Sequence, residues 1–403
     1  MVTQTHFHSG PADYPVLDWN GYHVRAVQSD ARPWPPTQQN IKSILVIKLD
    51  ALGDYVLHTP FYAHLRKNYP HAKITLACSK FTYELAAHNP RFDYIVPTPH
   101  APGFNQAEAF MFGIELQNHA AAPFDLILVP RWHEDWHHAG AVAQTLDAPY
   151  RLCYAGDVVP FKAEHFPQHD DYFTHVIEDA RPAHEVWRGM ELLHALGHPM
   201  PPIAEIKQEI HTLPADAEKM DALLAAQTLP RPWIAFGLGA SGEFKCWPAV
   251  RFSELAAEIL SAMDGTIFLM GHGKKDEDSA AIIQAAHPNA VNMVGKLSVR
   301  ESAVLISRCD GVVCNDSFPL HVAATYGVPA VEVVGQPADG RADSEYFPWC
   351  FGPWGNRFAW VHPTTCNASA NIIPDFRGEA KCIADVPAHD VFFALQEILN
   401  HAA

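Results

Sequence analysis

The strongest constraint on the fold is a regular alternation of short apolar runs with stretches of helical period, which begins near residue 43. In the first half of the chain, apolar runs that each precede a polar turn and a helix-like stretch lie at 44–48, 74–78, 94–96 and 126–129. In the second half, such runs lie at 234–237, 266–270, 291–294, 311–315 and 330–334, with helical patterns at 252–262, 301–308 and 320–326. Strands that alternate with helices predict parallel sheets covered on both faces. The predicted fold class is therefore α/β, with two successive doubly wound domains.

A proline-rich break, GHPMPPIAEIKQ at 197–208, separates the two halves. It predicts an N-terminal domain over residues 41–205 and a C-terminal domain over residues 206–403. Residues 1–40 are rich in Pro, Asp and His and show little periodicity, which predicts an irregular extension. With 403 residues the chain is long for a single core, so two domains are expected on length alone.

Charge and composition exclude several classes of function. The formal net charge of −17 argues against nucleic acid as a partner, because a phosphate backbone needs a basic surface. The same charge predicts at most peripheral, salt-sensitive contact with an anionic membrane. No apolar run is long enough to span a bilayer, and the amino terminus lacks the basic-then-apolar layout of a secretory signal. We therefore expect a cytoplasmic protein, and its eight cysteines without close pairing fit reduced thiols.

The first polar motif stands where the first strand ends. The apolar run 44–47 stops at Lys48, and Asp50, Gly53 and Asp54 follow within a few positions. Open α/β sheets bind their ligands beyond the carboxyl ends of their strands. In one interpretation Asp54 merely caps a helix after a turn at Gly53. In the other, Asp54 is a carboxylate that faces a ligand, and both interpretations can hold together.

The second motif is FGLGASGEFKCWPAVR, at 236–251. Its GLGASG matches the G-x-G-x-x-G dinucleotide fingerprint, which on its own is weak support for an NAD-dependent oxidoreductase. In that fingerprint the third glycine opens a helix, whereas here the helix is expected to begin near Pro248. We therefore predict a longer phosphate loop, with backbone N–H groups near Ser241 and a cation at Lys245. A plain glycine-rich turn with a solvated lysine is the alternative.

The third motif is VVCNDSFPLHVAATYG, at 312–327. A buried strand runs into Asp316 and Ser317, and a helix is expected to begin directly afterwards. Free N–H groups and the positive end of the helix dipole make such a start an anion site. Asp316 or Ser317 as a simple helix cap is the alternative. His321 lies one turn into the helix, where it could face the same anion or pack in the core.

Two further patterns suggest metal sites, and we favour a simpler interpretation of each. The D-x-D triplet at 276–278 is better explained as acidic residues at a helix start. Cys350, Cys366 and Cys382 are evenly spaced, but a closed metal site usually has four ligands and often a C-x-x-C pair. Buried thiols are the favoured interpretation, and no metal is predicted.

Together these motifs resemble glycosyltransferase family 9, the ADP-heptose heptosyltransferases that build lipopolysaccharide core or modify protein. The resemblance covers roughly residues 41–400, in order. It is carried by the LGD and TP start within 44–60, HEVWRGMELLHALGHP at 184–199, KCWPAVRF at 245–252 and NDSFPLHVAATYGVP at 315–329.

The resemblance implies a GT-B fold, in which two Rossmann-like domains face a central cleft. It implies inverting transfer of heptose from ADP-L-glycero-β-D-manno-heptose to an acceptor hydroxyl on a glycan, a lipid-linked molecule or a protein, with no cofactor required. The family's catalytic carboxylate falls on Asp54. Its donor-binding residues fall on Ser241, Lys245, Asp316, Ser317 and His321, with an acidic ribose contact at Asp276 or Glu277.

The sequence also departs from the family pattern. Position 318 is Phe where the family usually has Gly, which bears on how closely a phosphate approaches the backbone there. LVPRWHEDWHHAGA at 128–141 resembles a sub-branch with P-R-W-x-x-D, which makes Arg131 and Asp135, together with Asp50, candidates for the acceptor side. The spaced cysteines resemble an iron-binding finger of autotransporter heptosyltransferases, with one ligand missing. A non-catalytic sugar-nucleotide binder is the remaining alternative.

Overall fold

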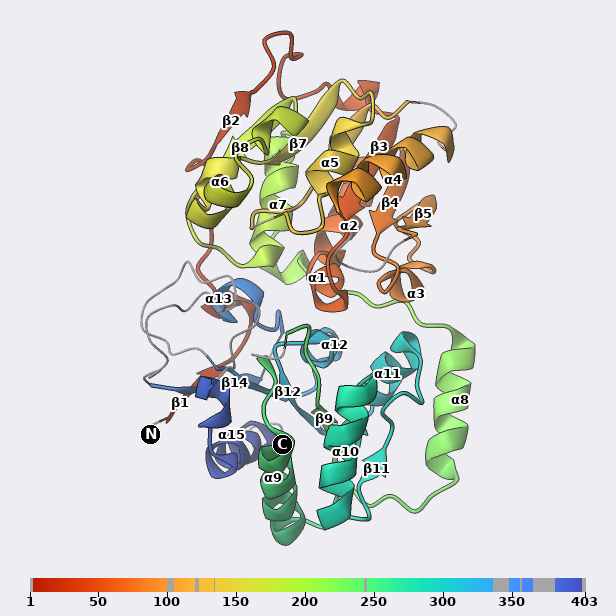
Figure 1. The fold of residues 1–403 in the computed structure, drawn as a ribbon, viewed down its shortest axis with the longest axis vertical. Helices are drawn as coiled ribbons and strands as arrows, with labels where there is room; N and C mark the ends of the chain where they lie inside the picture. The colour runs from red at the N-terminus through yellow and green to blue at the C-terminus, as the bar shows by residue number, and fades with distance from the viewer. Residues whose placement is uncertain are drawn as a thin grey trace. The chain divides into compact units, whose positions relative to one another are not determined.

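The computed structural model describes residues 3–99, 105–119, 123–133, 135–242, 245–335, 348–355, 357–364 and 381–400. The chain divides into two compact units, each drawn in Figure 1. The N-terminal unit is Pro15–Lys207, and the C-terminal unit combines Gln208–Ala403 with Met1–Tyr14. The chain thus passes from one unit to the other at the end of the proline-rich break.

The N-terminal unit is built on a seven-stranded sheet of order β2-β8-β7-β6-β3-β4-β5. The edge strand β2 pairs antiparallel with β8, and the other pairs are parallel. Its strands are β2 (His23–Ala26), β3 (Ser43–Lys48), β4 (Lys73–Cys78), β5 (Tyr94–Pro97), β6 (Leu126–Leu128), β7 (Tyr150–Tyr154) and β8 (His175–Glu178). Its α-helices are α1 (Leu52–Leu57), α2 (Thr59–Asn68), α3 (Tyr83–Ala86), α4 (Gln106–His119), α5 (Ala139–Gln144), α6 (Pro160–His165) and α7 (Glu185–Ala195).

The C-terminal unit is built on a second seven-stranded sheet, of order β1-β14-β13-β12-β9-β10-β11. Here β1 is the antiparallel edge strand and the other pairs are parallel. Its strands are β1 (Thr3–His8), β9 (Trp233–Gly237), β10 (Thr266–Met270), β11 (Val291–Asn292), β12 (Gly311–Asn315), β13 (Ala330–Val333) and β14 (Phe358–Pro363). Its α-helices are α8 (Pro214–Ala225), α9 (Ala249–Ala262), α10 (Lys274–Ala286), α11 (Val299–Ile306), α12 (Phe318–Tyr326), α13 (Pro348–Phe351), α14 (Lys381–Ala384) and α15 (Ala388–Asn400).

Alternate residues of the central strand β9 point into different cores. Ile234 and Phe236 join a core that includes residues of α9, α10 and α15, whereas Ala235 joins a core with residues of α8, α11 and α12. A strand buried on both faces needs apolar side chains at every position, which is why it appears in the sequence as a continuous apolar run. The α/β prediction is confirmed, and each predicted strand lies within two residues of its predicted bounds.

The prediction of an irregular extension over residues 1–40 is wrong in two stretches. β1 pairs with β14 along its whole length, and β2 pairs with β8. Both are edge strands with polar and mixed side chains, so they lack the apolar run that marks a central strand. The missed strand β1 nevertheless contributes to the core through His8, which is 8% exposed and stacks on Phe358 with ring centroids 4.7 Å apart.

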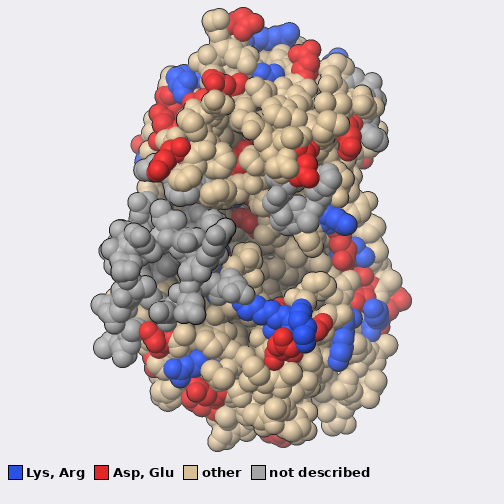
Figure 2. Space-filling model, viewed as in Figure 1, with Lys and Arg blue, Asp and Glu red and all other residues tan. Residues whose placement is uncertain are grey.

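Charged side chains on the face drawn in Figure 2 are interspersed rather than sorted by sign. Among the residues coloured there, acidic and basic groups alternate over both units, without one broad basic surface.

We predict that His8→Ala destabilises the C-terminal unit, because it removes an aromatic ring that packs on Phe358 and Trp360 and anchors β1. Loss of a buried ring and its stacking should lower the free energy of unfolding by about 1–3 kcal/mol. Phe7→Ala is the matched control, since the neighbouring Phe7 ring is 50% exposed. Chemical denaturation of both variants measures the difference, and equal stability of the two would show that β1 does not depend on His8.

Candidate active site

The polar cluster at the end of β3 begins with an ion pair that is almost fully buried. Lys48 is the last residue of the strand, and its Nζ lies 3.0 Å from Oδ2 of Asp50. The Lys48 ammonium also donates to the carbonyl oxygen of Pro130, at 3.3 Å. The backbone of Asp50 is fixed as well, because its carbonyl accepts hydrogen bonds from the Ser79 and Thr82 hydroxyls. The strand therefore ends in a rigid loop that holds a charged side chain in place.

Arg131 joins this cluster from the loop after β6. Its guanidinium donates to Oδ1 of Asp50 at 2.8 Å, so Asp50 receives one cation on each oxygen. Burial alone would raise the pKa of Asp50, but Arg131 and Lys48 hold it well below its usual range. Of the three acceptor-side candidates, the structure thus brings Asp50 and Arg131 together.

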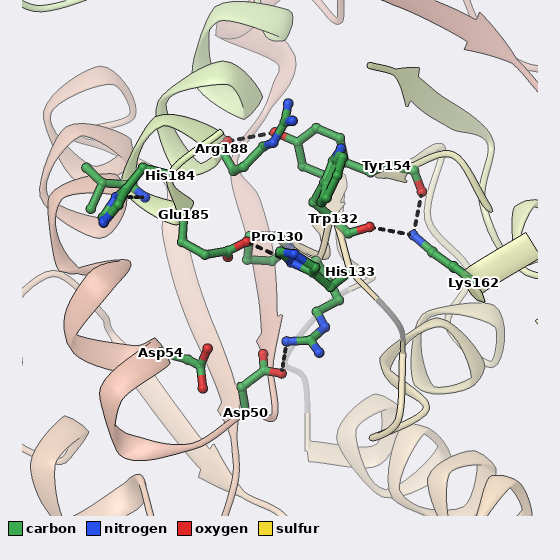
Figure 3. A network of polar contacts seen from close by, with 12 residues as sticks. Asp50, Asp54, Pro130, Trp132, His133, Tyr154, Lys162, His184, Glu185 and Arg188 are labelled. Carbon is green, nitrogen blue, oxygen red and sulfur yellow. Dashed lines mark hydrogen bonds and ion pairs between the residues drawn. The ribbon is translucent and has the colours of Figure 1, made fainter. Parts of the chain in front are cut away.

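Asp54 lies beside Asp50, on the first turn of α1, as Figure 3 shows. It makes no ion pair or side-chain hydrogen bond with the residues that the structure describes. Burial, followed by the neighbouring Asp50 carboxylate, raises the pKa of Asp54 to about 6. A carboxylate with a raised pKa and no cation of its own has the properties of a general base that works near neutral pH.

The interpretation of Asp54 as a helix cap is wrong. α1 begins at Leu52 with Ala51 as its N-cap, so Asp54 is the third residue of the helix. Gly53 also lies inside this helix and has no left-handed backbone conformation, so it does not make the predicted turn. The helix starts earlier than expected, and this leaves the Asp54 carboxylate without a backbone N–H to satisfy.

Three further residues complete the cluster, and the sequence did not single them out. Glu185 opens α7 and is 1% exposed. Its carboxylate oxygens lie 3.3 Å from Nδ1 of His133 and 3.6 Å from Nε2 of His58. Figure 3 shows Glu185 and His133 pointing toward each other, above Asp54 and Asp50 in the view. Glu185 falls within the motif at 184–199, and that position in a motif was the only signal that could have drawn attention to it.

Asp135 has a structural role. Its two carboxylate oxygens accept hydrogen bonds from the backbone N–H groups of Ala139 and Gly140, at 2.8 and 2.7 Å. It therefore caps the start of α5, and it is 4% exposed. Because both oxygens are already used, we leave Asp135 out of the proposed acceptor site.

In the C-terminal unit, the side chain of Asn315 ties the predicted phosphate loop to the end of β12. Its Oδ1 accepts from the Trp247 N–H at 2.9 Å, and its Nδ2 donates to the Leu238 carbonyl at 3.0 Å. Asn315 is fully buried, and these bonds join the two ends of the loop. α9 begins at Ala249 with Pro248 as its N-cap, as the longer loop predicted. The loop therefore lacks the glycine at a helix start that an NAD-binding fingerprint requires.

Lys245 and Asp316, both predicted to hold a diphosphate, contact each other. Lys245 Nζ lies 2.5 Å from Oδ2 of Asp316, and both side chains are less than one-fifth exposed. The alternative of a solvated lysine is therefore wrong. This ion pair holds the glycine-rich loop next to the carboxyl end of β12.

The start of α12 lies next to this pair. Ser317 is the N-cap residue, but its hydroxyl donates to the Asn315 carbonyl and does not cap the helix N–H groups. His321 is 2% exposed, and burial followed by the charge of Lys245 opposes its protonation, with a pKa lowered to about 4. It is a neutral imidazole at pH 7. Phe318, at the position where the family usually has Gly, packs against the core on this face.

The acidic residues at the start of α10 have different surroundings. Asp276 is buried and accepts a hydrogen bond from the His272 N–H at 2.8 Å. A Cβ atom on Gly239 would lie 2.4 Å from the Asp276 carboxylate, so this second glycine of GLGASG is needed for close packing. Glu277 is exposed in the same first turn, and Ser241 is exposed in the loop. The explanation of the D-x-D triplet as acids at a helix start is confirmed.

No group of three potential metal ligands occurs among the residues that the structure describes. Cys350 is buried, Cys366 lies outside the described residues, and the Cys382 backbone belongs to α14. A metal site at these cysteines therefore stays an untested alternative. Within the described ranges, no helix is both long enough and apolar enough to cross a bilayer.

Comparison with known proteins agrees with this geometry. The family model for glycosyltransferase family 9 (heptosyltransferase) matches residues 166–365. Lipooligosaccharide heptosyltransferase 2 of Haemophilus ducreyi is 27% identical over 71% of this chain and 80% of its own length. Lipopolysaccharide heptosyltransferase 3 of Escherichia coli is 24% identical over 86% of this chain and 96% of its own.

Solved structures show the same fold. A family 9 glycosyltransferase from Veillonella parvula superposes with a TM-score of 0.71 and 20% identity, over 89% of this chain and 98% of that one. The ADP-heptose LPS heptosyltransferase II of E. coli superposes with a TM-score of 0.66 and 20% identity, over 89% and 99%. Two doubly wound sheets of this kind define the GT-B class of glycosyltransferases. The chain belongs to glycosyltransferase family 9 and is an enzyme of that family.

We predict that Asn315→Ala destabilises the C-terminal unit more than the replacement of a single polar residue usually does. It leaves the Trp247 N–H and the Leu238 carbonyl without their buried partner, which should cost about 2–4 kcal/mol of unfolding free energy. Asn289→Ala, at an exposed position of the same unit, is the control. Urea unfolding of the two variants gives the comparison, and an Asn315→Ala protein as stable as the control would contradict the role of Asn315.

Proposed function

We propose that this enzyme transfers heptose from ADP-L-glycero-β-D-manno-heptose to an acceptor hydroxyl, with inversion at the anomeric carbon. The observation that carries the proposal is the Asp54 carboxylate at the end of β3, which has a raised pKa and no ion-pair partner among the described residues. The acceptor that the relatives' names favour is a lipopolysaccharide or lipooligosaccharide. The cytoplasmic location stays a prediction.

The donor side of the proposal rests on the loop around Lys245. A pyrophosphate needs positive charge and N–H donors, and here a lysine, a glycine-rich loop and the start of α12 occur together. Lys245 would exchange its Asp316 partner for a phosphate oxygen, and Ser241 and Ser317 would offer N–H or hydroxyl groups. The exposed carboxylate of Glu277 would accept from the ribose hydroxyls. The name of the E. coli enzyme with the same fold, an ADP-heptose transferase, supports the choice of nucleotide.

The acceptor side rests on Asp54 and the charged groups beside it. In the proposed step the acceptor oxygen attacks the anomeric carbon while Asp54 takes the hydroxyl proton, and the bond to the ADP phosphate breaks. Lys245 and the N–H groups of α12 stabilise the negative charge that grows on the leaving diphosphate. Arg131 is held by Asp50 and would orient an anionic or polyhydroxyl acceptor.

The first test is Asp54→Asn, which keeps the shape of the side chain and removes its ability to accept a proton. General base catalysis contributes typically 10²–10⁴-fold, so turnover should fall by about that factor. Donor affinity and melting temperature should stay close to those of the wild type, because the proposed donor contacts lie in the other unit. All three quantities are measured on one preparation, and near-normal turnover of ADP-heptose would remove Asp54 from its proposed role.

The second test addresses the donor. Lys245→Ala removes one charge-assisted contact, worth about 1.5–3 kcal/mol, and should raise the donor KM by about ten- to a hundredfold. Lys219→Ala, which removes an exposed lysine of the same unit, should leave donor kinetics unchanged. Steady-state kinetics with ADP-heptose, together with its ADP-mannose and UDP-sugar counterparts, give the result. An unchanged donor KM in a folded Lys245→Ala protein would contradict the proposed donor site.

A further inference from the structure

The buried carboxylate of Glu185 has no role in the mechanism proposed above. It is 1% exposed at the first position of α7, with His133, His58 and Lys48 as its charged or polar neighbours. A charge taken out of water is costly unless it is paired. Burial would raise the pKa of Glu185, but His133 and Lys48 hold it well below its usual range. Glu185 is therefore a permanent negative charge inside the N-terminal unit.

Among the residues that the structure describes, the ion pairs of the cluster balance without Asp54. The two cations, Lys48 and Arg131, face two carboxylates, Asp50 and Glu185. Lys48 lies between its two acids, 3.0 Å from Asp50 and 4.0 Å from Glu185. Asp54 is a third carboxylate in the same region, and no described cation lies within ion-pair distance of it.

We propose that Glu185 is a positioning residue for the reaction: it holds Lys48 on the side of the cluster away from Asp54, and so keeps Asp54 available to take the acceptor's proton. The inference rests on the proposed function, since it concerns the same base. Without Glu185, the Lys48 ammonium would have one buried carboxylate fewer to bind and could turn toward Asp54. A base bound by a lysine accepts a proton less readily.

The remaining groups around Asp54 do not take over this role. His58, at the end of α1, has a pKa lowered to about 4 by burial and by Lys48, so it is neutral at pH 7. His133 contacts Glu185 and not Asp54, and His137 acts on Asp50. The titratable and charged groups that face this region are Lys48, Asp50, His58, Arg131, His133, His137 and Glu185. Among them, Glu185 and Asp50 are the negative charges that raise the pKa of Asp54.

The test is the pH dependence of turnover in Glu185→Gln. In the wild type the base must be ionised, so kcat should fall as pH drops through about 6, the pKa of Asp54. Glu185→Gln removes a negative charge and lets Lys48 approach Asp54, and both changes lower the pKa of Asp54. The acid limb of the profile should therefore move to lower pH by about one unit. The maximal rate should fall at the same time, because a weaker base takes the proton less readily.

Two variants separate this effect from simple damage. Glu185→Asp keeps the negative charge and should restore the acid limb to within a few tenths of a unit of wild type. Glu191→Gln is the matched control, because Glu191 is a second fully buried acid on α7 whose pKa is raised to about 8 by burial. Glu191 pairs with Arg188 at 2.9 Å and is not among the groups that shift the pKa of Asp54, so its replacement should leave the limb in place. A folded Glu185→Gln enzyme whose rate is reduced equally at every pH would overturn the proposal.

A measurement without substrate tests the coupling of Glu185 to Asp54 separately from the transfer reaction. Carboxyl ¹³C NMR of Asp-labelled protein follows the titration of Asp54 directly, with Asp54→Asn to assign its signal. The Asp54 signal should titrate near pH 6 in wild type and at lower pH in Glu185→Gln. If the wild type transfers no heptose but this shift occurs, the proposed function fails while the coupling of Glu185 to Asp54 stands. If heptose transfer occurs and the signal does not shift, the inference about Glu185 fails by itself.

Should Glu185→Gln not fold, Lys48→Gln tests the same coupling with the opposite sign. Loss of the cation removes a charge that lowers the pKa of Asp54, so its titration should move to higher pH. An unchanged or lower titration in a folded Lys48→Gln protein would contradict the proposal.

Discussion

The balance of buried charge at the end of β3 is the interaction on which the rest of the site depends. Two cations and two carboxylates neutralise one another in a place from which water is largely excluded. Each charge would be costly alone, so the four have to be present together. The four residues come from the end of β3, from the loop after β6 and from the start of α7. Their pairing fixes these three elements next to one another, beyond the carboxyl end of β3. The same ion pairs therefore hold these elements together and set the electrostatic surroundings of Asp54.

The C-terminal unit also contains a mostly buried cation that is paired with a carboxylate. Lys245 has a carboxylate partner, Asp316, which makes a mostly buried lysine tolerable when no phosphate is bound. The loop that carries Lys245 is shaped by neutral hydrogen bonds from Asn315 instead of further ion pairs. In the proposed donor site, a diphosphate would have to replace Asp316 as the partner of Lys245. The affinity for a diphosphate would then depend on the difference in free energy between the Lys245–phosphate and the Lys245–Asp316 ion pairs. Such a difference favours ligands with a high density of negative charge.

The sequence predicted strands such as β3 and β12 because each is buried on both faces and forms an unbroken apolar run, as 44–47 and 311–314 do. It predicted Asp54, Lys245 and Asp316 as site residues because each follows a strand or lies in a glycine-rich loop. It missed the edge strands β1 and β2, whose positions allow polar side chains. It also missed three interior strands, β7, β8 and β14, in which Arg151, His175 and His362 interrupt the apolar run. It also missed Glu185 and its contacts with His58 and His133, since residues this far apart in the chain meet only in the folded sheet. It proposed a cap at Asp54 because the true start of α1, at Ala51 and Leu52, has no capping side chain to mark it.

The edge strand β1 has a consequence for how the chain is put together. Since the C-terminal unit contains both Met1–Tyr14 and Gln208–Ala403, the N-terminal unit is an insertion within it. During synthesis β1 emerges long before β14, the strand with which it pairs, and the whole inserted unit is made in between. Closing a contact over so many residues is entropically slow, whereas the inserted unit has all its own strands in one continuous segment. The order of assembly is thus built into the topology: the unit that carries Asp54 can fold first, and the sheet that carries Lys245 gains its last strand from the beginning of the chain.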